Sequence, residues 1–129
     1  MKKVLAISHD FHVSAISRYI PERSNPNNSI FFFAYWITIT NKSENSAQLI
    51  NRYWKITDAD GRINEINGSG VIGEQPYLKP GKSFEYNSFC PLPTEFGFME
   101  GYYDMNNKKQ KIFQIKIPQF RLSKPHSAN

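Results

Sequence analysis

The segment of this sequence whose spelling most directly suggests chemistry is a glycine-rich string at residues 68–73, with Gly68, Gly70 and Gly73 in G-x-G-x-x-G spacing. That spacing is typical of loops that hold a pyrophosphate, provided that the glycines open a helix whose N-terminus faces the phosphates. Pro76 and Pro80 follow closely, and a proline removes an amide donor and bends a helix. The sequence therefore predicts no helix after Gly73 and excludes a Rossmann-type site.

Two interpretations of the three glycines are left open. Successive backbone N–H groups in a glycine turn can form a small anion nest without a helix, so Gly68, Gly70 and Gly73 are weak candidates for binding pyrophosphate or a nucleotide phosphate. Arg52, Arg62 or the C-terminal lysines would supply the positive charge. The structural interpretation, which the sequence favours, is that the glycines let a strand end turn and pack closely on its neighbour.

Side chains suited to acid–base or metal chemistry are few. The histidines are His9, His12 and His126, all near the ends of the chain, so we expect no enzyme activity and no cofactor. A divalent metal at His9, Asp10 and His12 is a further alternative. In an extended strand only Asp10 and His12 would share a face, and because two ligands make a weak site we expect no metal centre.

Cys90 is the single cysteine, so no disulfide forms within the chain and a cytoplasmic location is expected. We expect its thiol to be buried and inert. Asp58 and Asp60 could suggest calcium, but a calcium site takes about six to eight oxygen ligands, whereas the order Asp58-Ala59-Asp60-Gly61 is that of a hairpin turn.

The elements that must position these residues are strands. Aromatic residues make up 15% of the 129 residues, and apolar side chains alternate between turn signals about every ten residues. This pattern predicts a single all-β domain, an immunoglobulin- or fibronectin type III-like sandwich of about seven strands, with an ordered core over residues 10–122 and a flexible tail over residues 123–129. The expected strands cover residues 10–20, 30–41, 48–57, 62–66, 83–88, 97–105 and 111–118.

Two of these strands carry specific predictions. In residues 30–41, the odd-numbered apolar residues from Phe31 to Ile39 face the core, whereas Phe32 and Trp36 form a partly exposed patch or lie under a loop. In residues 48–57, Ile50, Arg52, Trp54 and Ile56 face inward. Because an unpaired buried charge is costly, Arg52 must find a carboxylate or several carbonyl groups there.

The charge is uneven, with a net value of +5 and a carboxylate-free basic stretch near the C-terminus that would attract an anionic partner. The alternative is that these residues protect an edge strand against aggregation. A nucleic-acid role is not expected, because Phe113 is assigned to the core and leaves no stacking platform. Residues 4–7 are too short an apolar run for a signal peptide, and no membrane segment is expected.

From about Tyr19 to Leu122 the chain resembles the ApaG family. The residues that carry the resemblance include Phe33, Ala34, Tyr35, Asn41, Arg52, Trp54, Asp58, Gly61, Gly68, Gly70, Val71, Gly73, Pro76, Pro80, Gly81, Phe84, Tyr86, Ser88, Gly97, Met99, Gly101, Tyr103, Pro118, Phe120 and Leu122. The chain departs from the usual family pattern at Phe89, where glycine is typical, and at Glu95 and Phe96, where smaller residues are usual.

The resemblance implies a fibronectin-type sandwich, a link to divalent-cation tolerance and use as an interaction module, with no known reaction. Together with the residues, it favours a non-enzymatic domain that binds an unidentified protein partner through strand faces or edges. A small anion at the glycine loop is the second hypothesis, and a homo-oligomer stays open.

Overall fold

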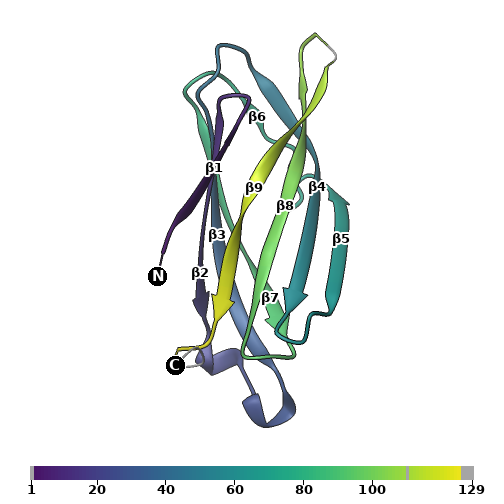
Figure 1. Cartoon of the computed structure of the whole chain (residues 1–129). Helices are drawn as coiled ribbons and strands as arrows, with labels where there is room; N and C mark the ends of the chain where they lie inside the picture. Colours follow the sequence, from purple (N-terminus) through teal and green to yellow (C-terminus); the bar gives the residue numbers. More distant parts are fainter. Residues whose placement is uncertain (1, 110, 126–129) are drawn as a thin grey trace.

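The computed structural model describes residues 2–109 and 111–125 and consists of two antiparallel sheets packed face to face (Figure 1). The first sheet has the order β1 (Val4–Ser8), β2 (Phe11–Tyr19), β3 (Phe31–Asn41), β7 (Ser83–Leu92). The second has the order β5 (Ile63–Ser69), β4 (Ala47–Asp58), β8 (Phe96–Asn107), β9 (Ile112–Ser123), and β6 (Tyr77–Leu78) also pairs with β4. The predicted all-β sandwich is confirmed.

The core lies between the sheets and follows from the two-residue period of the strands. Along β3, Phe31, Phe33, Tyr35, Ile37 and Ile39 are buried, as predicted from their alternation. Trp54 of β4 packs against Tyr35 and Phe120, with ring centroids 5.4 and 5.9 Å apart. The tryptophan therefore joins side chains of both sheets, as expected for a core residue.

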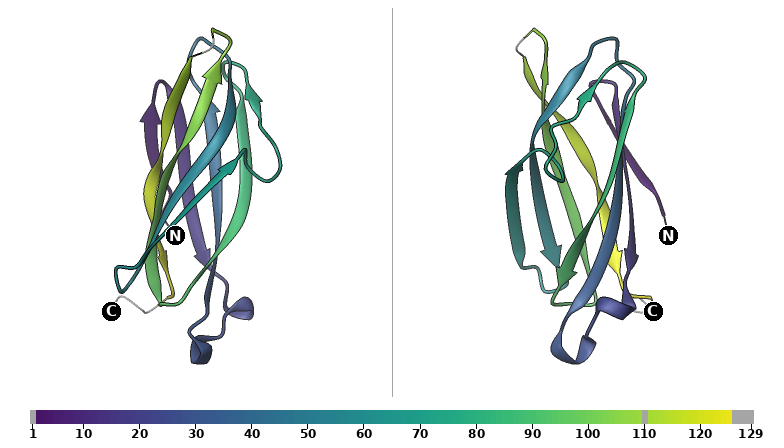
Figure 2. Two further views of the ribbon diagram at one scale, coloured as in Figure 1. Left: turned by 90° about the vertical axis from the view of Figure 1, so that its right-hand side faces the viewer. Right: turned by 180° about the vertical axis from the view of Figure 1, so that it is seen from behind.

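The two long sides of the sandwich differ (Figure 2). On one side β9 lies against β1 and β2: the Lys116 amide donates to Ser8 Oγ at 3.0 Å, and Ser17 Oγ donates to the Arg121 carbonyl at 2.6 Å. The opposite side is bordered by β7 and β5, which end their sheets. The hairpin that follows β5 covers part of this second side.

Nine strands are described where about seven were expected: the two additional strands are β1 and the two-residue β6, and β7 is longer than expected. Residues 4–8 form β1, whose alternation puts Leu5 and Ile7 on the outside. The strand expected over residues 83–88 continues through Pro91 to Leu92 as β7. Since β7 is an edge strand, the missing amide of Pro91 costs no ladder hydrogen bond.

A register shift in β4 corrects one predicted face. The pairing of β4 with β8 is irregular between Leu49 and Asn51. Leu49 is fully buried and Ile50 only half-buried, whereas beyond the shift Trp54 and Ile56 face inward as predicted. The inward assignment of Ile50 was therefore wrong, because an extra residue in one strand reverses the alternation.

Within residues 2–109 and 111–125 the helical segments are two short 3-10 turns, η1 (Pro21–Arg23) and η2 (Pro26–Asn28). Across the described ranges no helix has the length and apolar character needed to cross a membrane. The tail expected over residues 123–129 falls partly outside these ranges: Ser123 ends β9, and residues 126–129 are not described.

Candidate functional site

The glycine string forms a tight hairpin at the open side of the sandwich. Val71 and Glu74 exchange backbone hydrogen bonds of 2.8 and 2.9 Å around a two-residue turn. The turn residues Ile72 and Gly73 have φ of 49° and 73°, a combination typical of type I′ turns. Strand β6, not a helix, follows it, so the prediction of no helix after Gly73 is confirmed.

Gly68 and Gly70 serve close contacts. A Cβ on Gly68, in the last part of β5, would lie 2.8 Å from the Arg52 guanidinium, which covers this glycine from the paired strand β4. A Cβ on Gly70 would lie 2.2 Å from the Glu74 carbonyl oxygen, and the φ of Gly70 is 62°. Only glycine lets Arg52 and the turn approach so closely.

The arginine is held by carbonyl groups. Arg52 Nη1 donates to the carbonyls of Ser69 and Gly70 at 3.0 and 2.9 Å. The prediction that Arg52 finds a carboxylate or several carbonyls is confirmed through its second option. Within residues 2–109 and 111–125 no ion pair to Arg52 is found, because the only pairs join Arg62 to Asp58 and Asp60.

Arg52 borders a pocket of about 250 Å³ between the glycine hairpin and β7. Arg52, Tyr35, Tyr86 and Ser88 provide its polar groups. Its apolar wall is formed by Trp54, Val71 and Ile72. We call this the arginine pocket. All the residues that line it except Ile72 are among those on which the family resemblance rests.

The tyrosines of this region are held neutral. Burial raises the pKa of Tyr35, Tyr86 and Tyr103, and the nearby Arg52 acts in the opposite direction on all three. Tyr86 and Tyr103 are hydrogen-bonded through their hydroxyl groups, and Ser88 is the hydrogen-bonding neighbour of Tyr35. The guanidinium is therefore the charged group among the residues that line the pocket.

The proposed anion role of Gly68, Gly70 and Gly73 stays a prediction. The geometry favours their structural role, because the amides of Gly70, Val71 and Glu74 donate to carbonyl oxygens at 2.7–2.9 Å. Of the cations suggested for this role, Arg52 lies at the loop. Arg62 lies at the opposite end of β5, paired with Asp58 and Asp60.

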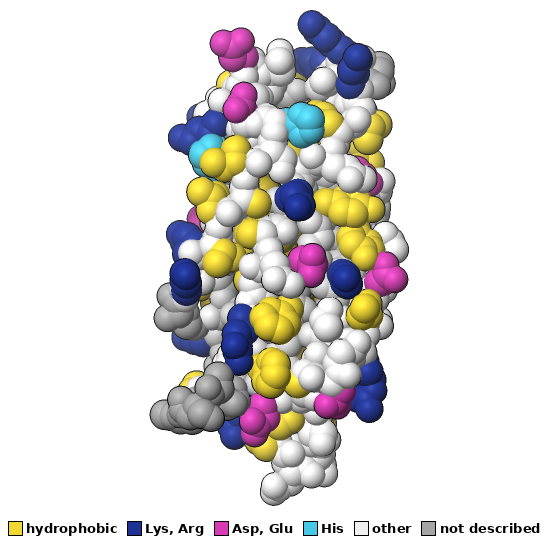
Figure 3. Space-filling model, viewed as in Figure 1, with side chains coloured by type: hydrophobic (Ala, Val, Ile, Leu, Met, Phe, Trp, Pro, Cys, Tyr) yellow, Lys and Arg dark blue, Asp and Glu magenta, His cyan; other side chains and the backbone are white. Residues whose placement is uncertain are grey.

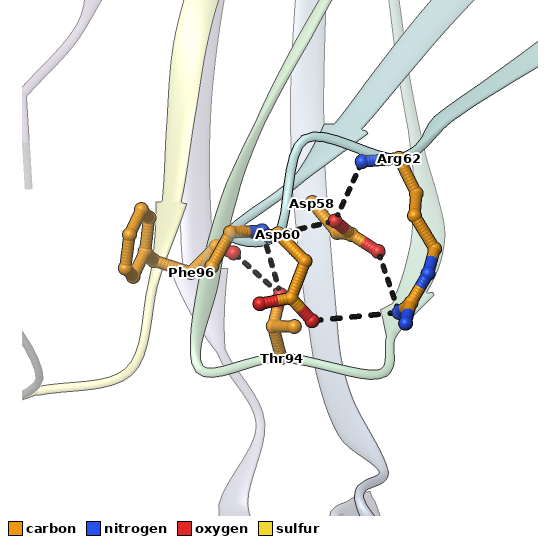
Figure 4. A network of polar contacts seen from close by, with 6 residues as sticks. Asp58, Asp60, Arg62, Thr94 and Phe96 are labelled. Atoms are coloured by element: carbon orange, nitrogen blue, oxygen red, sulfur yellow. Dashed lines mark hydrogen bonds and ion pairs between the residues drawn. The ribbon is translucent and has the colours of Figure 1, made fainter.

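The two aspartates belong to the turn between β4 and β5 (Figure 4). Asp58 Oδ1 accepts hydrogen bonds from the amides of Asp60 and Arg62, at 2.9 and 3.0 Å. The Ala59 amide donates to Thr94 Oγ1, which ties this turn to the one between β7 and β8. The carboxylate oxygens are thus used within the turn, as the turn interpretation predicted.

The remaining candidates lie apart from the arginine pocket. His9 and Asp10 form the turn between β1 and β2, with φ of 50° and 63°, and His12 follows in β2. In the described part of the chain no three His, Cys, Asp or Glu side chains come close enough to hold a metal ion. Cys90 is buried, and burial raises its pKa to about 12, so its thiol stays protonated at neutral pH.

The C-terminal basic residues do not form a single stripe. Figure 3 shows Lys and Arg side chains spread over the face that contains β9, with acidic side chains between them. Lys111, Lys116 and Arg121 are exposed on or next to β9, which is an edge strand. This placement favours the edge-protecting interpretation.

A second candidate surface lies on the outer face of the first sheet. Trp36 and Phe89 are 37% and 47% exposed, and the ring of Phe32 packs against that of Phe89 in a tilted arrangement, with centroids 5.4 Å apart. Arg23 lies over Phe32 and Phe89, at 4.4 and 5.2 Å, and Arg18 lies 5.7 Å from Trp36. We call these five residues the aromatic–arginine face. The predicted partly exposed patch at Phe32 and Trp36 is thereby found.

Comparison with known proteins decides the family. Residues 21–107 match the family model of the ApaG domain. The chain belongs to the ApaG family. The resemblance drawn from the residues alone is therefore confirmed.

Full-length relatives agree with this assignment. An ApaG protein of Beijerinckia indica is 46% identical over 121 residues, which cover 94% of this chain and 93% of the relative. An ApaG protein of Methylocella silvestris is 45% identical over 93% of this chain and 92% of the relative. A crystal structure of an ApaA protein from Bordetella pertussis has a TM-score of 0.88 at 43% identity, covering 94% of this chain and 98% of that one.

Sequence reasoning missed four residues of the arginine pocket and the aromatic–arginine face. Ser88 and Tyr86 were assigned to a strand without a role, and Arg18 and Arg23 were not connected with the aromatic patch. The alternation of β2 and β3 could have placed Arg18 beside Trp36, since Ile16 pairs with Trp36 and Arg18 with Ala34. The position of Arg23 depends on turn η1, for which the sequence offered no rule.

Proposed function

We propose that this chain is a non-enzymatic interaction domain of fibronectin type, which binds an acidic segment of a partner protein on the aromatic–arginine face. The observation that carries the proposal is the exposure of Trp36 and Phe89 beside two arginines on the outer face of the first sheet. Tryptophan and arginine are enriched among the residues that dominate protein interfaces.

The chemistry of the partner follows from that of the face. Phe32, Trp36 and Phe89 offer flat apolar area with little rotamer freedom to lose. Arg18 and Arg23 lie on these rings, and within the described ranges neither forms an ion pair. A partner segment that combines apolar side chains with carboxylates would cover the rings and neutralise both arginines.

The non-enzymatic part of the proposal rests on the state of the candidate nucleophile. Cys90 has a pKa raised to about 12 by burial, and the reactive form of a cysteine is the thiolate. Its Sγ lies 3.8 Å from the Pro91 carbonyl oxygen, a weak acceptor contact that does not activate it.

Affinity capture tests the proposal. Wild-type protein and the variants Trp36→Ser and Phe89→Ser are compared for retention of the same cellular partner, with Tyr102→Ser on the outer face of the second sheet as the matched control. We expect each face variant to lose about tenfold or more in affinity, as hot-spot truncation typically does, and the control to bind as wild type does.

The dependence of partner affinity on salt, and the oligomeric state of the protein, provide two further tests of the proposal. Because the partner is acidic, affinity should fall as ionic strength rises. A partner retained equally by Trp36→Ser and Phe89→Ser would contradict the proposal. If the face instead binds a second copy of this chain, sedimentation will show a wild-type dimer that both variants dissociate, which would replace the acidic partner with a homo-oligomer.

A further inference from the structure

The arginine pocket is a second candidate site, separate from the aromatic–arginine face. Arg52 reaches it from β4, Tyr86 and Ser88 from β7, and Ile72 from the glycine hairpin. The pocket therefore joins the two sheets at the open side of the sandwich. Nothing in the proposed interaction with an acidic segment uses it.

The donors of Arg52 are divided between structure and pocket. Nη1 donates hydrogen bonds to the carbonyls of Ser69 and Gly70, and these bonds fix the guanidinium over Gly68. A guanidinium carries five N–H groups, so the Nε and Nη2 edge still offers parallel donors. Such an edge fits the two oxygens of a carboxylate in a bidentate pair.

The charge of the pocket selects a singly charged ligand. Burial raises the pKa of Tyr35 and Tyr86, so both hydroxyls stay neutral and can donate hydrogen bonds. One guanidinium balances one negative charge. A pyrophosphate, with several charges, would bring excess negative charge into a half-buried site, and uncompensated buried charge is costly.

The wall opposite the charge is apolar. Trp54 and Val71 are 3% and 1% exposed and form the inner wall, whereas Ile72 is 57% exposed and lies at the turn. A ligand whose carboxylate pairs with Arg52 can therefore place a small apolar body against these side chains. A volume of about 250 Å³ restricts that body to a short one.

From these contacts we propose that the arginine pocket binds a monocarboxylate with a small apolar body, its carboxylate paired with Arg52 and hydrogen-bonded by Ser88 or Tyr86. The glycine string then acts indirectly: Gly68 makes room for Arg52, and the hairpin supplies the carbonyls that hold it. The same chemistry is offered by a free short-chain acid and by the C-terminal residue of a peptide chain.

Substitutions at residue 72 can test the effect of charge at the pocket separately from the effect of shape. Ile72 has φ of 49°, a conformation that Asp and Asn adopt more readily than isoleucine, so neither substitution should harm the turn. Ile72→Asp places a carboxylate at the pocket beside Arg52, where it competes with the ligand. Ile72→Asn has nearly the same shape and turn preference without the charge, and is the matched control.

The experiment is a titration followed by the amide and Arg52 Nε signals in NMR spectra. The probes are isovalerate, a short peptide that ends in leucine with a free carboxylate, the same peptide with an amidated terminus, and pyrophosphate. We expect saturable shifts at Arg52 and residues 68–73 with isovalerate or the free-acid peptide and none with the amide. The tighter of the two acids identifies the source of the ligand.

Acid binding by variants at residues 72 and 52 tests the proposed site. Ile72→Asp should bind the acid about tenfold or more weakly than Ile72→Asn does, since both variants lose the apolar contact of Ile72 and only Asp adds a like charge beside the ligand. Arg52→Lys should weaken binding of the acid as well, because a lysine cannot form the bidentate pair. Equal binding by Ile72→Asp and Ile72→Asn, no saturable shift with either acid, or tighter binding of pyrophosphate would each overturn the proposal.

Discussion

The outer faces of the two sheets both expose aromatic rings, yet the polar and charged groups that contact those rings differ. On the second sheet, Tyr53 and Tyr102 stack with centroids 4.8 Å apart, and Tyr53 OH donates to Glu65 Oε2 at 2.7 Å. That hydrogen bond, together with desolvation and the negative charge of Glu65, raises the pKa of Tyr53 to about 12. Asp104 accepts hydrogen bonds from Asn51 and Gln114 on either side.

On the first sheet the rings of Phe32, Trp36 and Phe89 meet arginines instead of cross-strand polar partners. The positive charge that covers them is not neutralised within the described chain. Exposure of an aromatic ring is therefore not in itself a sign of binding. The stacked tyrosines of the second face have a polar partner in Glu65 of their own sheet, whereas Phe32, Trp36 and Phe89 are contacted by arginines. Arg121 makes similar contacts with Phe96 and Phe98 at the edge of the second sheet.

The largest expected effect is on the core that both faces share. Trp54→Ala removes a 3% exposed side chain that contacts Tyr35 and Phe120, and should lower the free energy of unfolding by about 3–5 kcal/mol. Because the core supports both sheets, chemical denaturation should report one cooperative transition at lower denaturant. A variant that unfolds at the wild-type midpoint would contradict the assignment of Trp54 to the core.

A smaller effect, confined to the second sheet, is expected from Gly70→Ala. The new Cβ would meet the Glu74 carbonyl oxygen at 2.2 Å, and alanine is strained at a φ of 62°. We expect a loss of more than about 1 kcal/mol, with faster amide exchange in β5 and unchanged exchange in β2 and β3.

The same variant separates the two interpretations of the glycine string. If the glycines serve the fold, the melting temperature falls whether or not pyrophosphate is present. A melting temperature that stays at the wild-type value without ligand, together with loss of a pyrophosphate-induced rise, would show that Gly70 serves an anion instead.

The smallest effects contrast the two faces directly. Tyr102→Ser removes a stacked pair and should cost about 0.5–1.5 kcal/mol beyond the loss of buried area. Phe89→Ser, on an edge strand and 47% exposed, should change stability less than Tyr102→Ser does. Thermal melts of both variants check this order, and a greater loss for Phe89→Ser would mean that the aromatic–arginine face serves the fold.

Much of the fold could be predicted because it depends on a local pattern. The alternation from Phe31 to Ile39 fixes the core face of β3, and Pro76 and Pro80 exclude a helix. The β4 irregularity could not be predicted, because a bulge depends on the partner strand β8 and leaves no mark in β4 itself. For the same reason the expected end of β7 at residue 88 was too early: a strand can continue through Pro91 because β7 is an edge strand.

The sites were less predictable than the fold. Glycine spacing drew attention to residues 68–73, but the role of Gly68 is set by Arg52, a residue of the paired strand. The arginine pocket combines β3, β4, β7 and the glycine hairpin, and their proximity follows from sheet order, not from sequence distance. Short polar residues such as Ser88 gain a role only through that proximity.

The indole signals of the two tryptophans, recorded while labelled protein is titrated with its captured partner, test most directly whether the aromatic–arginine face binds that partner. Trp36 lies on the aromatic–arginine face and Trp54 in the core, so one spectrum reports on both environments. We predict that the Trp36 indole N–H shifts and saturates with the partner, while that of Trp54 stays in place. A bound partner that leaves the Trp36 indole signal unshifted and instead shifts the backbone amide signals of Tyr53 and Tyr102 would contradict this placement of the partner.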